Sequence, residues 1–153
     1  MKLTNLTLIN FRSIEKLSVD FPSFYTAISG KNNSGKSNLL RVLKVLFEPE
    51  RRFRYRDEEV NFPQHFPVWK TKELTESIKF EMELQVDRFR DSAIFKLADE
   101  FFKVGDSVSS ITLQLSAEYS RDKDQPELVV SYGENQLDSF KSRTIFKTIR
   151  NSG

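Results

Sequence analysis

The segment from Gly30 to Ser37 has the most defined chemistry in this sequence. Gly30 and Gly35 enclose four residues and are followed by Lys36 and Ser37, which completes the pattern G-x-x-x-x-G-K-S/T. Glycines at both ends let the backbone curve so that successive N–H groups point inward, where they can bind phosphate oxygens. The Lys36 ammonium would then reach the β- and γ-phosphates, and the Ser37 hydroxyl would coordinate Mg²⁺. The segment predicts a site for ATP and Mg²⁺.

The sequence on either side of the loop supplies the context that this pattern requires. Residues 24–28 form a short apolar and β-branched run, as in a strand buried on both faces. Residues 36–47 carry apolar side chains at helical spacing, including Leu40, and Pro49 ends this helix. A chance glycine turn would not explain a Lys-Ser pair at the start of a helix. The expected nucleotide contacts are Gly30, Lys31, Asn32, Asn33, Ser34, Gly35, Lys36, Ser37 and Asn38.

Apolar periodicity predicts the elements that position this loop. The alternation of the first strand slips at Thr4–Asn5, which predicts a local irregularity. A helix at 90–104 would end at Gly105, and the weaker helical pattern from Leu137 onward predicts a tail that frays. The expected strands are residues 3–11, 17–21, 24–28, 78–86, 111–117 and 128–132.

The composition excludes several classes of protein and of site. With 38% hydrophobic residues and a net charge of +2, the 153-residue chain can build a core, which excludes collagen-like and disordered chains. The absence of cysteine and the single histidine, His65, exclude disulfides and Cys-ligated metals and disfavour a histidine-based triad. No apolar run approaches ~18–20 residues, and the N-terminus lacks a signal-peptide core. We therefore expect a cytoplasmic protein with no membrane partner.

Residues 1–47 resemble the N-terminal part of ABC-type ATPases of the SMC/RecF group. Residues 10–13 read Asn-Phe-Arg-Ser before the loop, Asn32 fits the G-x-N-x-x-G-K-S pattern of that group, and residues 38–40 open the helix as Asn-Leu-Leu. Asn33 stands where many relatives have Gly, a tolerated variant because Asn enters left-handed conformations readily. The likeness is strongest to the OLD-family (overcoming lysogenisation defect) ATPase–nucleases and the related AAA-type ATPases of phage defence.

The resemblance implies an α/β fold. It predicts the N-terminal lobe of an ABC-type P-loop NTPase, with a mixed sheet plus an antiparallel β subdomain, in an incomplete form. One partial ATPase domain would cover residues 1–153. Its parts would be strands, P-loop and first helix at 1–47, a charged insert or loop at 48–74, and a β subdomain with one or two helices at 75–153.

The resemblance also assigns residues outside the loop. It implies that Arg12 and Ser13 lie near the nucleotide, although Arg12 is equally explained as a turn residue between strands. In this family a glutamine that senses Mg²⁺ and the γ-phosphate follows the first helix, and Gln64 is the nearest match. A solvated loop glutamine is the simpler interpretation of Gln64. Gln85, on the polar face of a strand, is a second option.

The sequence offers only lookalikes for the catalytic carboxylates that the resemblance implies. In the family an apolar strand ends in Asp-Glu, where Asp supports Mg²⁺ and Glu polarises the attacking water. Residues 93–100 end in Asp99-Glu100, but their apolar spacing is helical. Residues 115–118 faintly resemble a signature segment but lack its glycines. We expect no catalytic residue in this chain; the carboxylates would lie well beyond position 153, which suits a truncated or split polypeptide.

The function expected from the resemblance needs a second component. A C-terminal ATPase lobe or second subunit would complete the site. ATP would then bridge two lobes in a dimer, and its hydrolysis would be coupled to DNA processing or phage defence. Alone, this chain would bind nucleotide weakly and hydrolyse it poorly or not at all. The alternative is a non-catalytic, nucleotide-gated module that regulates a partner protein. A small phosphotransferase is disfavoured by the β-rich second half.

Residues 51–56 form the one dense basic cluster, in which Phe53 and Tyr55 stand among four arginines. Arginine and aromatic side chains together suit phosphate contact and base stacking, which makes DNA a further candidate partner. A solvated charged loop, partly neutralised by the acids at 57–59, is the favoured interpretation of this cluster. His65 and Trp69 are expected to pack a loop rather than to catalyse.

Overall fold

The centre of the molecule is one antiparallel sheet. The computed structural model describes residues 1–24, 26–31, 35–47, 65–67, 76–123 and 125–152. Six strands follow the order β2-β1-β3-β4-β5-β6, and every pairing among them is antiparallel. Their bounds are β1 Lys2–Phe11, β2 Ile14–Asp20, β3 Ile78–Asp87, β4 Ser110–Tyr119, β5 Glu127–Tyr132 and β6 Asn135–Gln136. The predicted α/β class with an antiparallel β part is confirmed.

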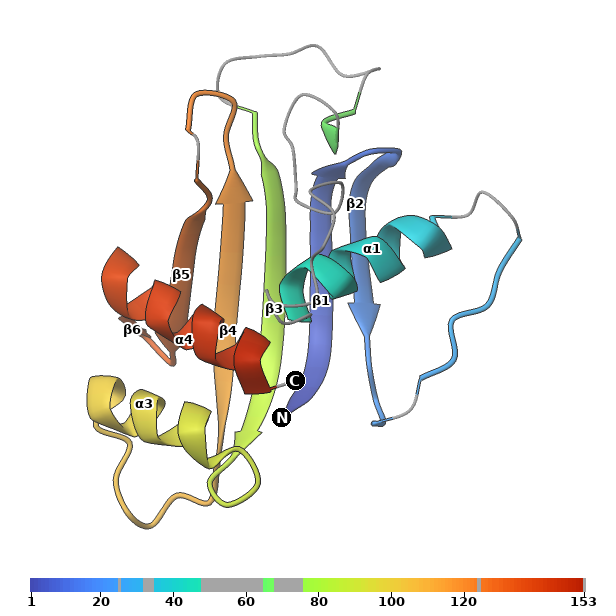
Figure 1. Cartoon of the computed structure of the whole chain (residues 1–153). Coiled ribbons are helices and arrows are strands. Elements are labelled where there is room, and N and C mark those ends of the chain that lie inside the picture. Colours follow the sequence, from blue (N-terminus) through green and yellow to red (C-terminus); the bar gives the residue numbers. More distant parts are fainter. Residues whose placement is uncertain (25, 32–34, 48–64, 68–75, 124, 153) are drawn as a thin grey trace.

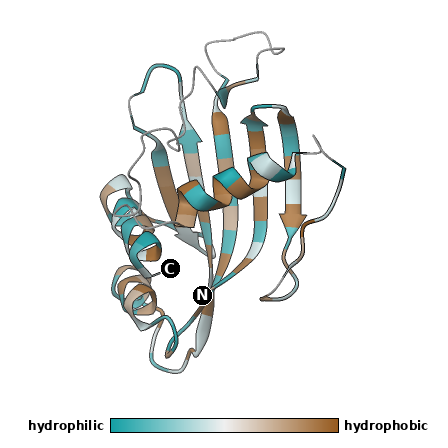
Figure 2. Ribbon diagram, turned by 45° about the vertical axis from the view of Figure 1, so that its right-hand side comes forward, coloured by the Kyte–Doolittle hydropathy of each residue, from teal (hydrophilic) through white to brown (hydrophobic). Residues whose placement is uncertain are grey.

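Three helices lie against one face of this sheet. Helix α1 (Lys36–Phe47) crosses in front of the strands at the β1 and β2 side, while α3 (Ser92–Phe102) and α4 (Ser139–Ser152) lie side by side near β4 and β5 (Figure 1). Hydrophobic and hydrophilic residues alternate along the strands (Figure 2). In β3 and β4 the hydrophobic set faces the helices, and the opposite face carries polar residues in the manner of antiparallel sheets. No helix among the described residues is long and apolar enough to cross a membrane.

Strand β1 contains the irregularity that its sequence predicts. Its pairing with β3 shifts register between Leu3 and Asn5, so one extra residue is accommodated at Thr4. The Thr4 hydroxyl donates to the carbonyl oxygen of Glu83 at 3.1 Å, which ties the shifted segment to β3. Beyond the shift, Leu6 and Leu8 both point into the core and are fully buried.

Helix α4 is packed, contrary to the fraying tail expected from Leu137 onward. Ser142, Ile145, Phe146 and Ile149 are buried and recur at helical spacing, so they form one face against the sheet. The Ser142 hydroxyl accepts the backbone N–H of Val130 at 3.0 Å. The sequence pattern underestimated this face because four basic residues lower the mean hydropathy of the helix. None of these four residues occupies a buried position.

Helix α3 ends at Phe102, two residues before the predicted end at 104. Lys103 adopts the left-handed conformation with a φ of 56°, and its N–H donates to the Asp99 carbonyl. Gly105 also has a positive φ, of 96°, but it lies outside the helix. The Asp99 carboxylate accepts the Gly105 N–H at 3.0 Å, which holds the chain after the helix end.

The strand expected at residues 24–28 is a wrong prediction. Residues 26–28 have no regular structure, and Phe24 is 64% exposed. A strand buried on both faces needs paired neighbours on both sides, whereas β2 is the edge of the sheet and no described strand pairs with residues 26–28. The segment between β2 and α1 runs outward from the sheet edge (Figure 1).

Candidate functional site

The phosphate-loop segment enters helix α1 through Gly35. Gly35 has a φ of 88°, in the left-handed region that disfavours side chains, and its carbonyl accepts the Leu39 N–H at 3.0 Å to begin the helix. A Cβ at Gly35 would meet the Ile14 side chain at 3.8 Å, an ordinary contact. The backbone angle, rather than lack of space, therefore requires glycine at this position.

The two residues with assigned phosphate chemistry lie in the first turn of α1. Lys36 opens the helix, and its ammonium donates to the carbonyl of Gly30, which draws the two ends of the loop together. Ser37 is exposed beside it, and no acidic residue occurs in the first turn. An ammonium, a hydroxyl and a helix N-terminus form a donor set that fits the phosphates and Mg²⁺ of MgATP. Lys31 is exposed, and Asn32, Asn33 and Ser34 lie outside the described residues.

The turn between β1 and β2 lies beside this loop. Arg12 and Ser13 form a two-residue connection between the paired residues Phe11 and Ile14. The Asn38 side-chain amide donates to the Ser13 hydroxyl at 3.2 Å, which joins the turn to the start of α1. The Ile14 side chain, directly after the turn, faces Gly35. The structure thus brings together three segments that the sequence singled out separately.

Arg12 has an unusual backbone conformation. Its φ is 55°, in the region that non-glycine residues enter at a cost. Its N–H donates to the carbonyl oxygen of His65, while its side chain is exposed. The ordinary turn interpretation of Arg12 accounts for its position between the two strands. The exposed guanidinium lies on the same turn as Ser13, which contacts α1.

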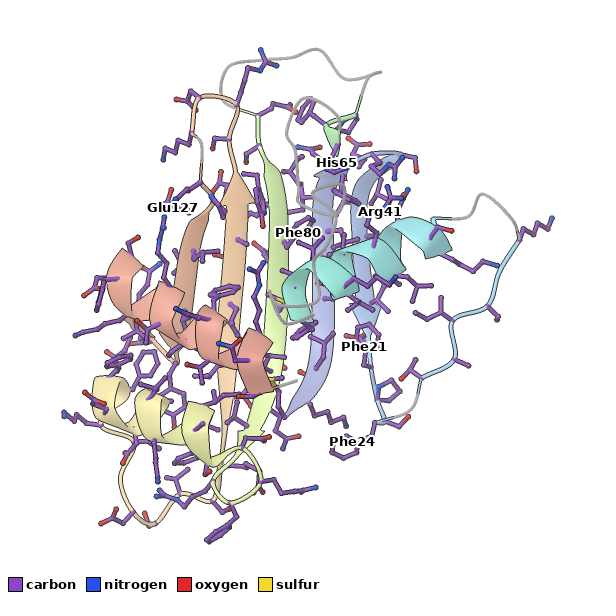
Figure 3. The ribbon with its side chains drawn as sticks, viewed as in Figure 1. Phe21, Phe24, Arg41, His65, Phe80 and Glu127 are labelled. Carbon is purple, nitrogen blue, oxygen red and sulfur yellow. The ribbon has the colours of Figure 1, made fainter. Side chains whose placement is uncertain are left out.

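His65 connects this turn to helix α1. Its ring is 7% exposed and lies 5.4 Å from the ring of Phe11. His65 lies near Arg41, which is a residue of α1 (Figure 3). Burial, and secondarily the positive charge of Arg41, lower the pKa of His65 below its usual 6.5. The prediction that His65 packs rather than catalyses fits this buried position. Gln64, Trp69 and the basic cluster at 51–56 lie outside the described residues.

The lookalike carboxylates lie elsewhere, on a helix. Asp99 and Glu100 belong to α3, as their apolar spacing predicts, so they do not end a strand beside the phosphate loop. Residues 115–118 belong to strand β4. No group of three or more potential metal ligands occurs in the part of the chain that the structure describes.

Gln85 is also distant from the loop. It pairs with Lys2, at the opposite end of β1 from the Arg12 turn. At about 3.3 Å per residue, roughly 30 Å separates these two ends of the strand. Gln85 therefore does not reach the phosphate loop, and its place on the polar face of β3 is explained by exposure alone.

Comparison with known proteins assigns the family. Residues 1–153 match the AAA ATPase domain family across their whole length. The chain belongs to the AAA ATPase domain family. It is 53% identical over 41 residues to the chromosome partition protein Smc of Methanocaldococcus jannaschii, which is 27% of this chain and 4% of that protein. It is 44% identical over 46 residues to the DNA replication and repair protein RecF of Enterococcus faecalis, which is 30% of this chain and 12% of that protein.

A solved structure extends the likeness to the whole fold of this AAA ATPase domain. A chain from a study of ATP-driven dimerization and DNA-stimulated activation of SMC ATPases matches with a TM-score of 0.51 and 16% identity. The match covers 98% of this chain and 78% of that one. The AAA ATPase domain thus has the P-loop NTPase fold of SMC ATPases and is related to SMC and RecF. It spans only a small part of the length of the two curated relatives.

Three contacts of the site had little or no signal in the sequence. The resemblance pointed to Arg12 and Ser13, but nothing in the sequence pointed to Ile14 as the residue facing Gly35. The bond between Asn38 and Ser13 joins residues 25 positions apart. The only hint of this bond in the sequence was that Asn38 and Ser13 both lie in segments that resemble the same family. The approach of His65 to the turn had no signal of any kind.

Proposed function

We propose that this chain binds MgATP through the loop that opens helix α1. The observation that carries the proposal is the arrangement around Lys36: its ammonium and the Ser37 hydroxyl stand at a helix N-terminus that has no acidic residue. Phosphates would replace the Gly30 carbonyl as the partner of Lys36. Membership of the AAA ATPase domain family supports ATP and Mg²⁺ as the ligands.

The Arg12–Ser13 turn is the second part of the proposed site. Its contacts with α1 through Asn38 and Gly35 support a place for the Arg12 guanidinium at the edge of the bound phosphates. Gln64, which immediately precedes His65 in the sequence, is proposed as the glutamine that senses Mg²⁺. These two assignments extend the site beyond the loop itself.

Hydrolysis is proposed to need a C-terminal ATPase lobe, from the same or a second polypeptide. The described residues bring no Asp-Glu pair to the phosphate loop, which supports this requirement. ATP would then hold two lobes together, and the cycle would act on DNA, as suggested by the relationship to Smc and RecF. The finer assignment, to phage defence as in OLD-family ATPases, rests on the sequence resemblance.

The nucleotide site is tested by replacing Lys36. We expect Lys36→Ala to weaken binding of a fluorescent ATP analogue in the presence of Mg²⁺ by roughly 10- to 150-fold, the range for losing a hydrogen bond to a charged group. Lys44→Ala is the matched control because Lys44 is an exposed lysine in the last turn of the same helix. Equal affinities for Lys36→Ala, Lys44→Ala and the unaltered chain would refute the proposal.

The need for a second lobe is tested by turnover. The isolated chain should hydrolyse ATP poorly or not at all, and adding a C-terminal ATPase lobe should restore turnover that Lys36→Ala abolishes. Turnover at an ordinary enzymatic rate by the isolated chain would contradict this requirement. If ATP binds more tightly than ADP but turnover never returns, the alternative function applies: a nucleotide-gated module that regulates a partner.

A further inference from the structure

A groove runs beside helix α4, at the end of α1 opposite the phosphate loop. Its volume is about 240 Å³, and its walls come from α1, β4, β5 and α4. Apolar side chains form the floor, with Tyr119 and Phe146 as its aromatic members. Arg143, Lys147 and Arg150 complete the lining, and none of the described lining residues is acidic. The groove is therefore apolar at its base and cationic along one side.

The positive charge of this groove is concentrated in one helix. Helix α4 contains four basic residues and no acidic one, while the whole chain has a net charge of only +2. Arg143 donates to the side-chain oxygen of Gln125 and to the carbonyl of Pro126, both of which are neutral. These bonds orient its guanidinium without cancelling its charge, so it remains able to attract an anion.

The three cations stand in a single row. Positions 143, 147 and 150 are separated by four and three residues, so they share one helix face and span about 10 Å along it. One row of cations matches one phosphodiester strand, whereas a duplex offers two. The apolar floor offers no partner for a second row of phosphates, but the face of a base can pack against it.

Tyr119 supplies a rigid ring at the floor. It packs against Phe80 with ring centroids 5.7 Å apart and an interplanar angle of 62°, and Phe80 is fully buried. Tyr119 itself is half-buried, so part of its ring remains accessible in the groove. A ring fixed in this way can stack on a base at a low cost in conformational entropy.

We propose that this groove binds a single strand of nucleic acid, with its phosphates on Arg143, Lys147 and Arg150 and a base against Tyr119. The proposal rests on the DNA-associated part of the proposed function and adds to it a place on this chain and a preference for single strands. The groove also connects to the nucleotide site, because Arg150 donates to the Val45 carbonyl in the last turn of α1 at 2.9 Å.

The test measures binding of fluorescein-labelled oligo-dT and of a duplex of equal length to the whole 153-residue chain, by anisotropy over a range of salt. Because Arg143 and Lys147 are exposed, Arg143→Gln/Lys147→Gln should fold normally. We expect this double variant to bind oligo-dT about tenfold more weakly, with a salt slope smaller by roughly 1.4, since each single-strand contact contributes ~0.7. Lys16→Gln/Lys96→Gln, which removes the same charge from β2 and α3, should bind like the unaltered chain.

The aromatic floor has its own variants. Tyr119→Leu should weaken oligo-dT binding by roughly 5- to 150-fold, whereas Tyr119→Phe, which keeps the ring, should leave the affinity unchanged. Equal binding by the groove and control double variants, tighter binding of the duplex, or equal competition by polyglutamate would each overturn the proposal. Equal competition would instead indicate a docking site for an acidic peptide.

The same variants separate this proposal from the nucleotide site. Lys36→Ala should bind oligo-dT normally, and the groove double variant should bind the ATP analogue normally. If ATP binding fails in every form while oligo-dT binding still depends on the groove, the proposed ATP site is wrong and the groove proposal stands. If Lys36→Ala weakens ATP binding while oligo-dT binding does not depend on the groove, the groove proposal is wrong and the proposed ATP site stands.

Discussion

The segment from β2 to α1 and the pair β3–β4 are built in opposite ways. Strands β3 and β4 pair over ten residues each, and their inward side chains are buried from Ile78 to Val86 and from Ile111 to Ala117. The described residues between β2 and α1 lie beyond the edge of the sheet, and most of them are exposed. Residues 24–28 are at least as rich in apolar residues as β3 and β4, so pairing partners, rather than hydrophobicity, make the difference.

This comparison separates the residues that hold the molecule together from the residues of the proposed nucleotide site. The core consists of the sheet and one face of each helix, and α1 contributes Leu39, Val42, Val45 and Leu46 to it. The other end of the same helix carries the half-buried Lys36 and the exposed Ser37. Helix α1 therefore joins the core, through its buried face, to the exposed phosphate-loop segment.

The largest contrast is expected between two phenylalanines. Phe80 is fully buried and makes edge contacts with the rings of Phe11 and Tyr119, so Phe80→Ala should lower the free energy of unfolding by about 3–5 kcal/mol. Phe24→Ala, at a 64% exposed position, should change it by less than about 0.5 kcal/mol. Urea unfolding of both variants makes the measurement. Similar losses of unfolding free energy in the two variants would show that residues 24–28 are packed in solution. That result would contradict the difference drawn between the two regions.

A smaller effect is expected at Ser142, where a polar group lies inside the packed half. Ser142→Ala leaves the N–H of Val130 without its hydroxyl acceptor in a fully buried position, which should cost about 1–3 kcal/mol of unfolding free energy. Ser152→Ala is the control, because that hydroxyl bonds to the Thr148 carbonyl at an exposed site on the same helix. Equal stability of the two variants would mean that α4 does fray, as its sequence suggested.

Local sequence patterns predicted strands β3 and β4 and the register shift of β1 well. Strict alternation located β3 and β4, and the slip at Thr4–Asn5 located the register shift. Both features depend on residues that sit within one strand. The buried face of α4 escaped prediction because the four basic residues of this helix lower its mean hydropathy. In α1, Leu40 joined the expected apolar stripe but is 51% exposed, since Val42 and Val45 face the sheet in its place.

The site was predictable only where its chemistry is local. Gly35, Lys36 and Ser37 would act through their own backbone and side chains, so spacing alone was enough to propose them. The contact of Ser13 with Asn38 depends on a hairpin folding back onto a helix, which no spacing encodes. The strand expected at 24–28 failed for a related reason: a pattern predicts the ability to pair but not the presence of a partner.

Arg12 offers a way to separate backbone cost from side-chain function at the border of the two regions. With its φ at 55°, Arg12→Gly should be more stable than Arg12→Ala by about 1 kcal/mol, because glycine alone enters this region without penalty. If the guanidinium contacts the nucleotide, both variants should lose ATP affinity to the same extent. Thermal unfolding and ATP titration of the pair give the two values. Unchanged affinity in both variants would limit Arg12 to the role of a turn residue.

The smallest effect is expected from the protonation of His65, which lies between the Arg12 turn and α1. Its pKa is lowered by burial and by the charge of Arg41, so the unfolded chain binds the proton more readily than the folded one. Its contribution to stability is then complete above pH 6.5 and decreases as the pH falls from 6.5 towards the folded pKa. His65→Gln should remove this slope from the unfolding free energy measured between about pH 5.5 and 7.5.

The direction of the His65 pKa shift can be measured directly, because His65 is the only histidine in the chain. Its ring protons should titrate by NMR with a midpoint below 6.5, and Arg41→Gln should move that midpoint upward without bringing it to the usual value, since burial is the larger cause. A midpoint at or above 6.5 would mean that residues 65–67 leave the β1 turn in solution and belong with the exposed region rather than with the core.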